Sequence, residues 1–465
     1  MISTDTICAV STPAGQGGIA VIRVSGNDAV SICDKIFTPR SGAALSARKP
    51  NVLTFGHIYG NGNLIDEVFV VLFRAPHSYT GEDMIEVSCH GSLYIQQEML
   101  RCLLHEGCRL ASPGEFTQRA FLNGKIDLSQ AEAVADLIAS SSAATHRMAM
   151  KQMRGGVSDE LAGLRDKLLH FTSLVELELD FSEEDVEFAD RGELRELAVT
   201  IEKTIRRLTN SFHVGNAIKN GIPVAIIGET NVGKSTLLNF LLKEDKAIVS
   251  NIHGTTRDVI EDTITIDGIL FRFIDTAGIR ETHDTIERIG IDRTFQKLKQ
   301  ASIILWVIDS LSEFEEIERL GSRISAHLTG KKVIMVLNKV DLLDEQEKQG
   351  KEILLKQLLP TAEQVSISAT LQSHTDNLLH KLVQATSLPV IRDEDIIITN
   401  ARHYEALSKA HLAIMNVISN LDNHLSGELL SQDIRECMSH LGEITGQISN
   451  DEVLGNIFNK FCIGK

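Results

Sequence analysis

The stretch GETNVGKS, Gly228 to Ser235, decides the fold of the central part of this 465-residue chain. It follows the apolar run IPVAII and precedes the helical run TLLNFLL, so a strand, a glycine-rich turn and a helix are expected in this order. Glycines let backbone N–H groups curl around phosphates, and the helix N-terminus adds positive potential. Lys234 is expected to pair with the terminal phosphates as a catalytic group, and Ser235 to ligate Mg²⁺. The stretch predicts a nucleoside triphosphate site.

A later motif, NKVD (338–341), indicates which nucleotide is bound. It ends a predicted strand, where Asp341 can accept two hydrogen bonds from the guanine edge while Asn338 and Lys339 brace the loops. Adenine offers no such donor pair and would leave buried polar groups unpaired, and sites built on such bonds reject analogues strongly. The run SISAT contributes Ser368 and Ala369, from which a backbone N–H can reach the guanine carbonyl.

Two motifs between these stretches complete the pattern of a GTPase domain. GTTRD (254–258) offers Thr256 as a second Mg²⁺ ligand on a loop that can order around the γ-phosphate. DTAG (275–278) ends a predicted strand, where Asp275 can reach the metal through water and Gly278 can contact the phosphate. The predicted GTP-binding residues are Asn231, Val232, Gly233, Lys234, Ser235, Thr236, Ser250, Asn251, Ile252, His253, Gly254, Thr255, Thr256, Asp275, Thr276, Ala277, Gly278, Asn338, Lys339, Asp341, Ser368 and Ala369.

One position departs from the Ras pattern. Directly after DTAG the chain has Ile279, where Ras-like proteins have a glutamine that orients the attacking water. Isoleucine can neither orient nor deprotonate water, so another group must do so. The polar candidates downstream, which residue type alone does not separate, are Arg280, Glu281, His283, Asp284 and Glu287.

The chain as a whole is expected to be multidomain, with α/β and all-α parts. Residues 1–118 mix short β-like runs with turns, and residues 119–215 have a helical pattern. Residues 216–380 alternate strands and helices, as in a doubly wound sheet, and residues 381–465 are helical again. Two helical segments around an α/β unit predict a discontinuous helical domain interrupted by an inserted Ras-like P-loop G domain. The strands expected in the insertion are IPVAIIG, DTITIDG, ILFRFIDT, SIILWVID, VIMVLNK and EQVSIS.

Composition limits the other possibilities. The formal net charge of -17 argues against broad phosphate neutralisation of a nucleic acid, which needs a basic face. No targeting segment or run long enough to cross a bilayer is found, so we expect a cytoplasmic protein that binds no membrane. The seven cysteines form no metal-binding spacing and are expected to be reduced. The acidic run at 176–190 is interpreted as a solvated helix end and loop, and the alternative is a metal or partner site.

Cys462, four places from the carboxyl end of the sequence, has three interpretations: a prenylation site, a buried thiol or a reactive thiol. Prenylation is disfavoured, because Lys465 is a poor last residue for that signal and Gly464 replaces an aliphatic one. A thiol at a helix end with a lysine three residues away can have a lowered pKa, which favours thiolate. A small apolar filler remains the alternative.

Four runs outside the core GTPase motifs resemble those of one family, the tRNA modification GTPases called MnmE or TrmE. The resemblance covers nearly the whole chain, and it also includes Asn231 inside the phosphate loop. GTPase motifs are shared by many switches, whereas the N-terminal runs and the tail are specific to this family. The runs are AGQGGIAVIRVSG (14–26), HSYTGEDMIEVSCHG (77–91), SPGEFTQRAFLNGKIDLSQAEAVADLI (112–138) and FCIGK (461–465).

The resemblance implies a homodimer, a tetrahydrofolate-binding and dimerising N-terminal domain, and G domains that meet during hydrolysis. It also implies that K⁺ at the phosphate loop replaces an arginine finger, which is physically reasonable because a cation there stabilises the same developing charge. Glu287 matches the family glutamate that positions the attacking water. The implied K⁺ ligands are Asn231, Ser250, Ile252 and Thr255.

For the folate site, the positions that match the family are Arg23, Glu82, Lys125 and Lys465. Arg23 lies in an apolar strand, where an unpaired charge is costly, so a partner or ligand carboxylate is expected. The folate glutamate tail suits a lysine or arginine, and the donor pair of its pterin suits a carboxylate. In the family, the tail brings Cys462 close to this pocket as a candidate catalytic thiol. The run AGQGG precedes a strand and is therefore interpreted as a turn rather than a phosphate cradle.

The function implied by the resemblance is modification of the wobble uridine of certain tRNAs. An FAD-dependent partner resembling MnmG, joined in a heterotetramer, would act with this chain to add an aminomethyl or carboxymethylaminomethyl group at C5. The carbon would come from 5,10-methylenetetrahydrofolate, for which 5-formyl-tetrahydrofolate is an analogue, and GTP hydrolysis would supply the conformational drive. The alternative is a GTPase switch that docks on a ribosome or RNA assembly and modifies nothing. The tRNA-binding surface stays open, with Arg147, Lys151 and Arg154 either touching RNA or forming a solvated face.

Overall fold

The computed structural model describes residues 5–40, 42–180, 191–245, 262–274, 300–324, 328, 330–371, 375–386, 395–425, 427–448, 451–459, 461 and 464. They form two compact units. The first contains residues 1–139, 149–206 and 405–465, and the second contains residues 140–148 and 207–404. Three helices have residues in both units: α5 (Ala143–Met153), α7 (Arg191–Asn220) and α14 (Ala401–Asp422).

The first unit begins with a seven-stranded sheet in the order β3-β4-β5-β6-β2-β1-β7. All neighbouring pairs are antiparallel except β1 and β7. Four of its strands contain the apolar runs ICAV, IAVIRV, EVFVVLF and MIEVSC, in agreement with the β-like runs expected in residues 1–118. The bounds are β1 (Ile7–Val10), β2 (Gly17–Ser25), β3 (Phe37–Pro39), β4 (Leu53–Gly60), β5 (Asn63–Phe73), β6 (Met84–Gly91) and β7 (Arg109–Leu110).

Helices α1 (Ala29–Ile36) and α2 (Leu93–His105) cover one face of this sheet. Alternate strand residues such as Ile22 and Val70 point to that face and pack against Met99 and Leu103 of α2. The short 3-10 helix η1 (Leu45–Ala47) places the buried Leu45 in the same core. The run AGQGG is a bend only at its start, since its last two glycines open β2.

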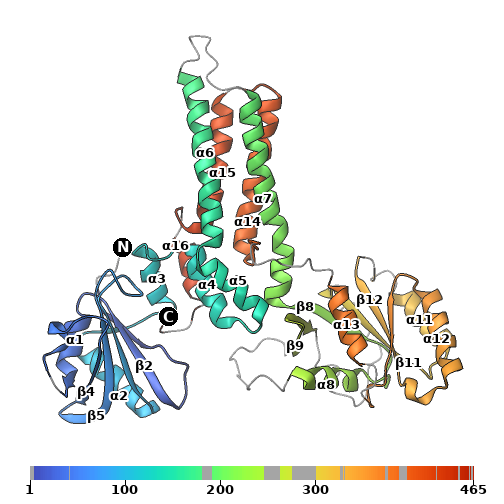
Figure 1. Ribbon diagram of the computed structural model, residues 1–465, viewed down its shortest axis with the longest axis horizontal. Coiled ribbons are helices and arrows are strands. Elements are labelled where there is room, and N and C mark those ends of the chain that lie inside the picture. Colours follow the sequence, from blue (N-terminus) through green and yellow to red (C-terminus); the bar gives the residue numbers. More distant parts are fainter. Residues whose placement is uncertain are drawn as a thin grey trace. The chain divides into compact units, whose positions relative to one another are not determined.

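The rest of the first unit is helical. Its further helices are α3 (Glu115–Leu122), α4 (Leu128–Ala139), α6 (Gly156–Asp180), α15 (Gly427–Thr445) and α16 (Asp451–Phe458). Figure 1 shows α6, α7, α14 and α15 side by side as a bundle. Ion pairs join segments that are far apart in sequence: Arg195 of α7 donates to Asp422 of α14, and Arg435 of α15 donates to Glu176 of α6. The discontinuous helical domain expected from the sequence is therefore confirmed.

Helix α6 buries the face that its apolar spacing predicts. Leu161, Leu164, Leu168, Thr172 and Val175 are all buried there. Leu179, the last position of the same stripe, has a side chain outside the described residues. The acidic stretch at 181–190 also lies outside them.

The second unit is a doubly wound α/β domain around a six-stranded sheet in the order β13-β12-β11-β8-β10-β9. Every neighbouring pair is parallel except the edge strand β9, which pairs antiparallel with β10. All six strands predicted for the insertion are present. They are β8 (Ile222–Ile227), β9 (Asp262–Ile266), β10 (Ile269–Phe273), β11 (Ile303–Asp309), β12 (Lys332–Asn338) and β13 (Glu363–Ser366).

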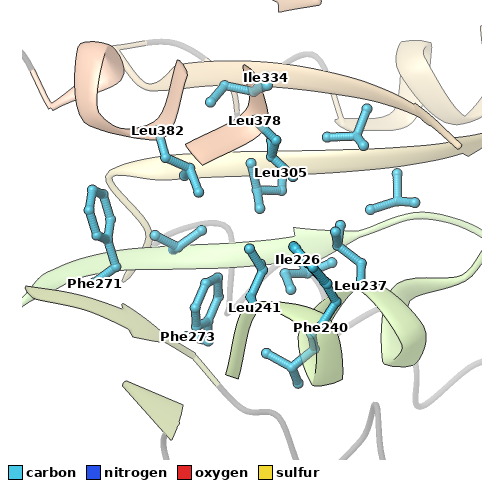
Figure 2. Packing of buried hydrophobic residues seen from close by; sticks show 14 of the residues in the cluster. Ile226, Leu237, Phe240, Leu241, Phe271, Phe273, Leu305, Ile334, Leu378 and Leu382 are labelled. Carbon is cyan, nitrogen blue, oxygen red and sulfur yellow. The ribbon is translucent and has the colours of Figure 1, made fainter. Parts of the chain in front are cut away.

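Helices cover both faces of this sheet, which is why its central strands are apolar along nearly their whole length. Figure 2 shows the core on one face, where Leu237 and Leu241 of α8 (Lys234–Asp245) and Leu378 of α13 (Thr375–Ala385) pack against the strands. The core on the other face includes Trp306 and residues of α11 (Phe314–Ile324) and α12 (Glu345–Leu358). In the described part of the chain, no helix is long and apolar enough to span a membrane.

The turn between β9 and β10 also has a sequence signature. Asp267 and Gly268 have positive φ angles of 51° and 78°, which is the backbone of the two-residue hairpin turns that Asp-Gly favours.

The parallel strands β8, β11 and β12 all end at one edge of the sheet, because their registers align Ile227 with Trp306 and Asp309 with Asn338. Loops that follow these strands are thereby brought together.

Candidate functional site

The loop between β8 and α8 has the backbone that phosphate binding needs. Gly228 has a φ of +147° and Gly233 a φ of +95°. A Cβ on Gly228 would lie 2.2 Å from the carbonyl oxygen of Val307, and one on Gly233 would lie 2.2 Å from Nδ2 of Asn338. Both positions therefore require glycine, for conformation and for space. Asn231, between them, also has a positive φ, of 60°.

Lys234, the first residue of α8, turns back over this loop. Its Nζ donates to the carbonyl oxygens of Gly228, at 2.9 Å, and Glu229. The ammonium group is thus held at the loop and at the start of the helix, where backbone N–H groups and the helix dipole also favour an anion. Ser235, the predicted Mg²⁺ ligand, follows in the first turn of α8.

Asn338 joins three segments that are far apart in sequence. Its side chain is 2% exposed. Nδ2 donates to the carbonyl oxygen of Val232 at 2.8 Å, and Oδ1 accepts from the backbone N–H of Ala369 at 3.0 Å. The phosphate loop, the NKVD loop and the SISAT loop are therefore tied together by one amide, which uses a donor and an acceptor at once.

The other residues predicted to recognise the base belong to the NKVD and SISAT loops. Asp341 is exposed in the 3-10 helix η4 (Val340–Leu342), immediately after Lys339. Ser368 is buried, and its Oγ accepts from the backbone N–H of Leu371 at 3.3 Å. The exposed carboxylate of Asp341 is available to a base, whereas the backbone N–H of Ala369, a predicted donor to the guanine carbonyl, is bound to Asn338 Oδ1.

Many of the residues predicted for the two sites are not among those that the structure describes, so only the described ones contribute to the geometry given above. The described members are Asn231 to Thr236, Asn338, Lys339, Asp341, Ser368 and Ala369. No group of three or more His, Cys, Asp or Glu side chains among the described residues has the geometry of a metal site. The undescribed members are Ser250 to Thr256, Asp275 to Gly278, Ile279, Arg280, Glu281, His283, Asp284, Glu287, Cys462 and Lys465.

A second polar site lies on the face of the N-terminal sheet opposite α1 and α2. The guanidinium of Arg23 donates to Glu86 Oε1 from Nε at 2.9 Å and from Nη2 at 2.7 Å. It also lies over the rings of Tyr79 and Phe116, at 5.2 Å and 5.6 Å from their centroids. The carboxylate partner expected for Arg23 within the protein is therefore Glu86, and the aromatic rings shield the pair from water.

Glu82 is held on the same side of the sheet by two donors. Ser25 Oγ donates to Glu82 Oε2 at 2.7 Å, and Arg119 Nη1 lies 3.2 Å from both carboxylate oxygens. Arg119 is 5% exposed and also donates to Asp5 and Glu115. Burial lowers the pKa of Arg119, but the carboxylates of Glu82 and Glu115 outweigh it, so that the net pKa lies above the ordinary value.

Arg119 and Glu115 were not predicted as members of this site. Their i,i+4 spacing in a helical run is a visible signal of an ion pair, yet it does not tell a buried pair from one on a solvated face. The fold buries both, and Arg109 closes the network by donating to Glu115 at 2.6 Å and 3.0 Å. The bidentate pairing shows that this network holds the helix α3 on the sheet.

Lys125 and the carboxyl-terminal tail reach the same domain. Lys125 Nζ donates to the carbonyl oxygen of Pro76 at 2.9 Å, and its stem passes Gly81 in the loop that carries Glu82. In the tail, the carbonyl oxygen of Gly464 accepts from Ser11 Oγ at 3.0 Å. Three of the four predicted folate-binding residues thus belong to adjoining segments, and the fourth, Lys465, follows Gly464.

The six cysteines among the described residues are free. Burial raises the pKa of Cys89 to about 11 and that of Cys437 to about 12. These thiols are therefore protonated at neutral pH and unsuited to nucleophilic chemistry. Cys462 lies outside the described residues.

Comparisons with known proteins match both units. The family model described as "GTP-binding protein TrmE N-terminus" matches residues 6–125, and the model described as "MnmE helical domain" matches residues 128–462. Proteins named "tRNA modification GTPase MnmE" are 62% identical in Bacteroides thetaiotaomicron and 53% identical in Flavobacterium johnsoniae, each over 100% of both chains. Among solved structures, Aquifex aeolicus Era bound to GDP and AlF4⁻ is 30% identical over 42% of this chain and 66% of its own, with a TM-score of 0.29.

Proposed function

Since this chain belongs to the MnmE (TrmE) family of tRNA modification GTPases, we propose that it uses GTP hydrolysis to drive a one-carbon modification of tRNA. The modification is addition of an aminomethyl or carboxymethylaminomethyl group at C5 of the wobble uridine. An FAD-dependent, MnmG-like protein is the proposed partner in a heterotetramer, and 5,10-methylenetetrahydrofolate is the proposed carbon donor.

The proposal assigns the chemistry of GTP cleavage to the loops around Lys234. Lys234 pairs with the terminal phosphates, and Ser235 with Thr256 holds Mg²⁺, which neutralises charge that develops on the phosphates. Asn231, Ser250, Ile252 and Thr255 hold K⁺ in place of an arginine finger, and Glu287 positions the attacking water. The described part of this assignment is supported by the positive φ angles of Gly228 and Gly233, which shape the phosphate loop, and by Lys234, whose ammonium group lies at that loop.

One observation carries the folate half of the proposal: Arg23 of β2 and Glu82, which Ser25 of the same strand binds, lie on one side of the N-terminal sheet, and the stem of Lys125 passes the loop that carries Glu82. Ser25 and Arg119 orient the carboxylate of Glu82, which is the proposed acceptor for the pterin. Tyr79, which is partly exposed, provides flat apolar surface close to Arg23. Lys125 is a cation for the glutamate tail, and Cys462 is the proposed thiol of the one-carbon step.

A homodimer is proposed to form through the N-terminal domain. Its open sheet face carries neighbouring apolar side chains on β4 and β5, including Leu53, which is 59% exposed, and Phe69, which is 46% exposed. The ring of Phe69 lies 5.3 Å from that of Phe55. An exposed cluster of this kind favours association. Light scattering on the purified chain should give twice the chain mass of 51.2 kDa, and a monomeric mass would contradict this part of the proposal.

The test of the folate site is direct binding of 5-formyl-tetrahydrofolate to the purified chain, measured by calorimetry. We expect saturable binding, weakened at least about tenfold by Glu82→Gln, because a hydrogen-bonded charge is lost. Glu67→Gln, at an exposed carboxylate of the same domain, is the matched control and should bind normally. Absent binding, or equal binding by the Glu82 variant, would contradict the folate assignment, while GTP hydrolysis reports separately on the G domain.

A further inference from the structure

The end of strand β11 contacts the base-recognition loop through a carboxylate that no sequence motif identifies. Asp309 is the last residue of β11 and pairs in register with Asn338, the last residue of β12. Its Oδ2 lies 2.5 Å from Lys339 Nζ, and its Oδ1 accepts from the backbone N–H of Leu311 at 3.0 Å. Both carboxylate oxygens are thus engaged, and one of them binds the lysine of NKVD.

This ion pair is better shielded than an ordinary surface pair. The side chain of Asp309 is 17% exposed and that of Lys339 is 32% exposed. Asp309 also lines one small pocket with Glu229 and Val232 of the phosphate loop. Partial removal from water strengthens the attraction and fixes the geometry of both groups.

Ser310 adds two hydrogen bonds to the same loop. It is fully buried. Its backbone N–H donates to the carbonyl oxygen of Asn338 at 2.9 Å, and its Oγ donates to the carbonyl oxygen of Lys339 at 2.9 Å. Two consecutive residues at the end of β11 therefore hold the side chain of Lys339 and two consecutive carbonyl groups of the loop.

The loop needs such support because of its backbone. Lys339 has φ 63° and ψ 31°, the left-handed conformation that a residue with a Cβ disfavours. The direction in which the chain leaves Lys339 sets the position of Asp341, two residues later in η4. A carboxylate meant to meet the guanine edge must be placed within a fraction of an ångström, so the conformation of Lys339 controls base recognition.

We propose that Asp309 is a positioning residue for guanine recognition. It acts through Lys339, holding the NKVD loop in its left-handed turn so that Asp341 faces the base, and it needs no contact with the nucleotide. Ser310 supports the same turn from the backbone side. This inference rests on the GTP hydrolase activity of the chain and is independent of the folate and tRNA chemistry proposed above.

The test is a double-mutant cycle on the full-length chain, with fluorescent GDP as the probe. Asp309→Asn keeps the shape of the side chain and removes its charge. We expect affinity for GDP and GTP to fall by about tenfold, through faster dissociation, because a partly buried hydrogen-bonded ion pair is lost. At saturating GTP and Mg²⁺ the hydrolysis rate should stay near that of the wild type, which separates positioning from catalysis.

The cycle is completed by Lys339→Met, alone and with Asp309→Asn. If Asp309 acts through Lys339, adding Asp309→Asn to the Lys339 variant changes GDP affinity less than twofold. Preference for GDP over IDP, which lacks the exocyclic amino group, should fall in Asp309→Asn as Asp341 loses its position. Glu363→Gln breaks a more exposed ion pair of the same domain, with Lys381 at 2.7 Å, and should leave GDP affinity unchanged.

Two results would overturn the proposal. One is that Asp309→Asn binds GDP as tightly as the wild type does. The other is that Asp309→Asn lowers GDP affinity by the same factor in the wild type and in Lys339→Met. Ser310→Ala provides a second route should the Asp309 variant unfold. It removes one hydrogen bond to the Lys339 carbonyl oxygen, and the same fall in preference for GDP over IDP is expected. Unchanged preference in a folded Ser310 variant would likewise count against the proposed role of this strand end.

Discussion

The Nδ2 atom of Asn338 lies 2.8 Å from the carbonyl oxygen of Val232, although the two residues are 106 positions apart in the sequence. This hydrogen bond joins the phosphate loop predicted from the sequence to the NKVD loop. Because Asn338 is almost completely buried, neither group can be satisfied by water when the bond is lost. The two halves of the nucleotide site are thereby coupled.

We expect Asn338→Ala to weaken both the fold of the G domain and nucleotide binding. The substitution leaves the Val232 carbonyl and the Ala369 N–H without partners, which costs about 1–3 kcal/mol of unfolding free energy for a buried group. Urea unfolding and titration with fluorescent GDP measure the two effects. Asn216→Ala, which loses only an exposed hydrogen bond to Asn220, is the matched control. Stability like that of the control in Asn338→Ala would contradict the coupling.

Potassium dependence tests the role proposed for Asn231. Its positive φ means that Asn231→Gly removes the side chain without straining the backbone. We expect GTP turnover by the wild type to be at least about tenfold faster in KCl than in NaCl, since a correctly placed cation stabilises the developing charge. In Asn231→Gly the two rates should become equal. Equal rates in the wild type would remove the K⁺ site from the mechanism.

The pH dependence of stability should report on the buried network around Glu115. Burial raises the pKa of Glu115, but hydrogen bonds from Arg109 and the Ser112 N–H outweigh it, so the folded-state pKa lies below the ordinary value. A depressed pKa means that the stabilising contribution is present above the unfolded-state pKa and is lost as pH falls through the folded-state value.

Glu115→Gln should therefore destabilise the protein by about 2 kcal/mol at pH 7, and by progressively less as the pH falls below the ordinary pKa of a glutamate, 4.5. Chemical unfolding of both proteins across this range measures the difference. Glu67→Gln, on an exposed face, should show no such trend. If the difference in unfolding free energy between the wild type and Glu115→Gln stays constant with pH, the charge of Glu115 does not stabilise the fold.

The tail offers a test that separates the folate site from the G domain. A Cβ on Gly464 would lie 2.2 Å from the carbonyl oxygen of Val10, and its φ of +94° also disfavours other residues. We expect Gly464→Ala to displace the tail and to weaken 5-formyl-tetrahydrofolate binding about tenfold, if Lys465 adds an ion pair to the ligand. GTP turnover should be unchanged.

Gly455→Ala is the control for this substitution, because nothing lies within 4 Å of a Cβ at that helical position. Alanine there should stabilise α16 by about 0.5–1 kcal/mol and leave folate binding intact. Folate binding by Gly464→Ala equal to that of the control would indicate that the tail does not contribute to the pocket.

The sequence by itself determined the elements whose signals are local. Strands β8 to β13 follow from apolar runs bounded by turns, the hairpin at Asp267 and Gly268 from a dipeptide that tolerates positive φ, and the phosphate loop from glycines placed between a strand and a helix. The same holds for the buried stripe of α6, which depends on a period of 3.6 residues. These features are set by a few neighbouring residues, so no distant contact is needed to predict them.

Only the tertiary structure decided which partners the polar residues take. Arg23 was expected to meet a carboxylate, but its pairing with Glu86 depends on the register of β2 and β6. Arg119 is buried beside Glu82, which is 37 residues away in the sequence. Asp309 likewise contacts Lys339, which is 30 residues away. An ion pair depends on distance and on exclusion of water, and both are properties of the packed chain rather than of any stretch of it.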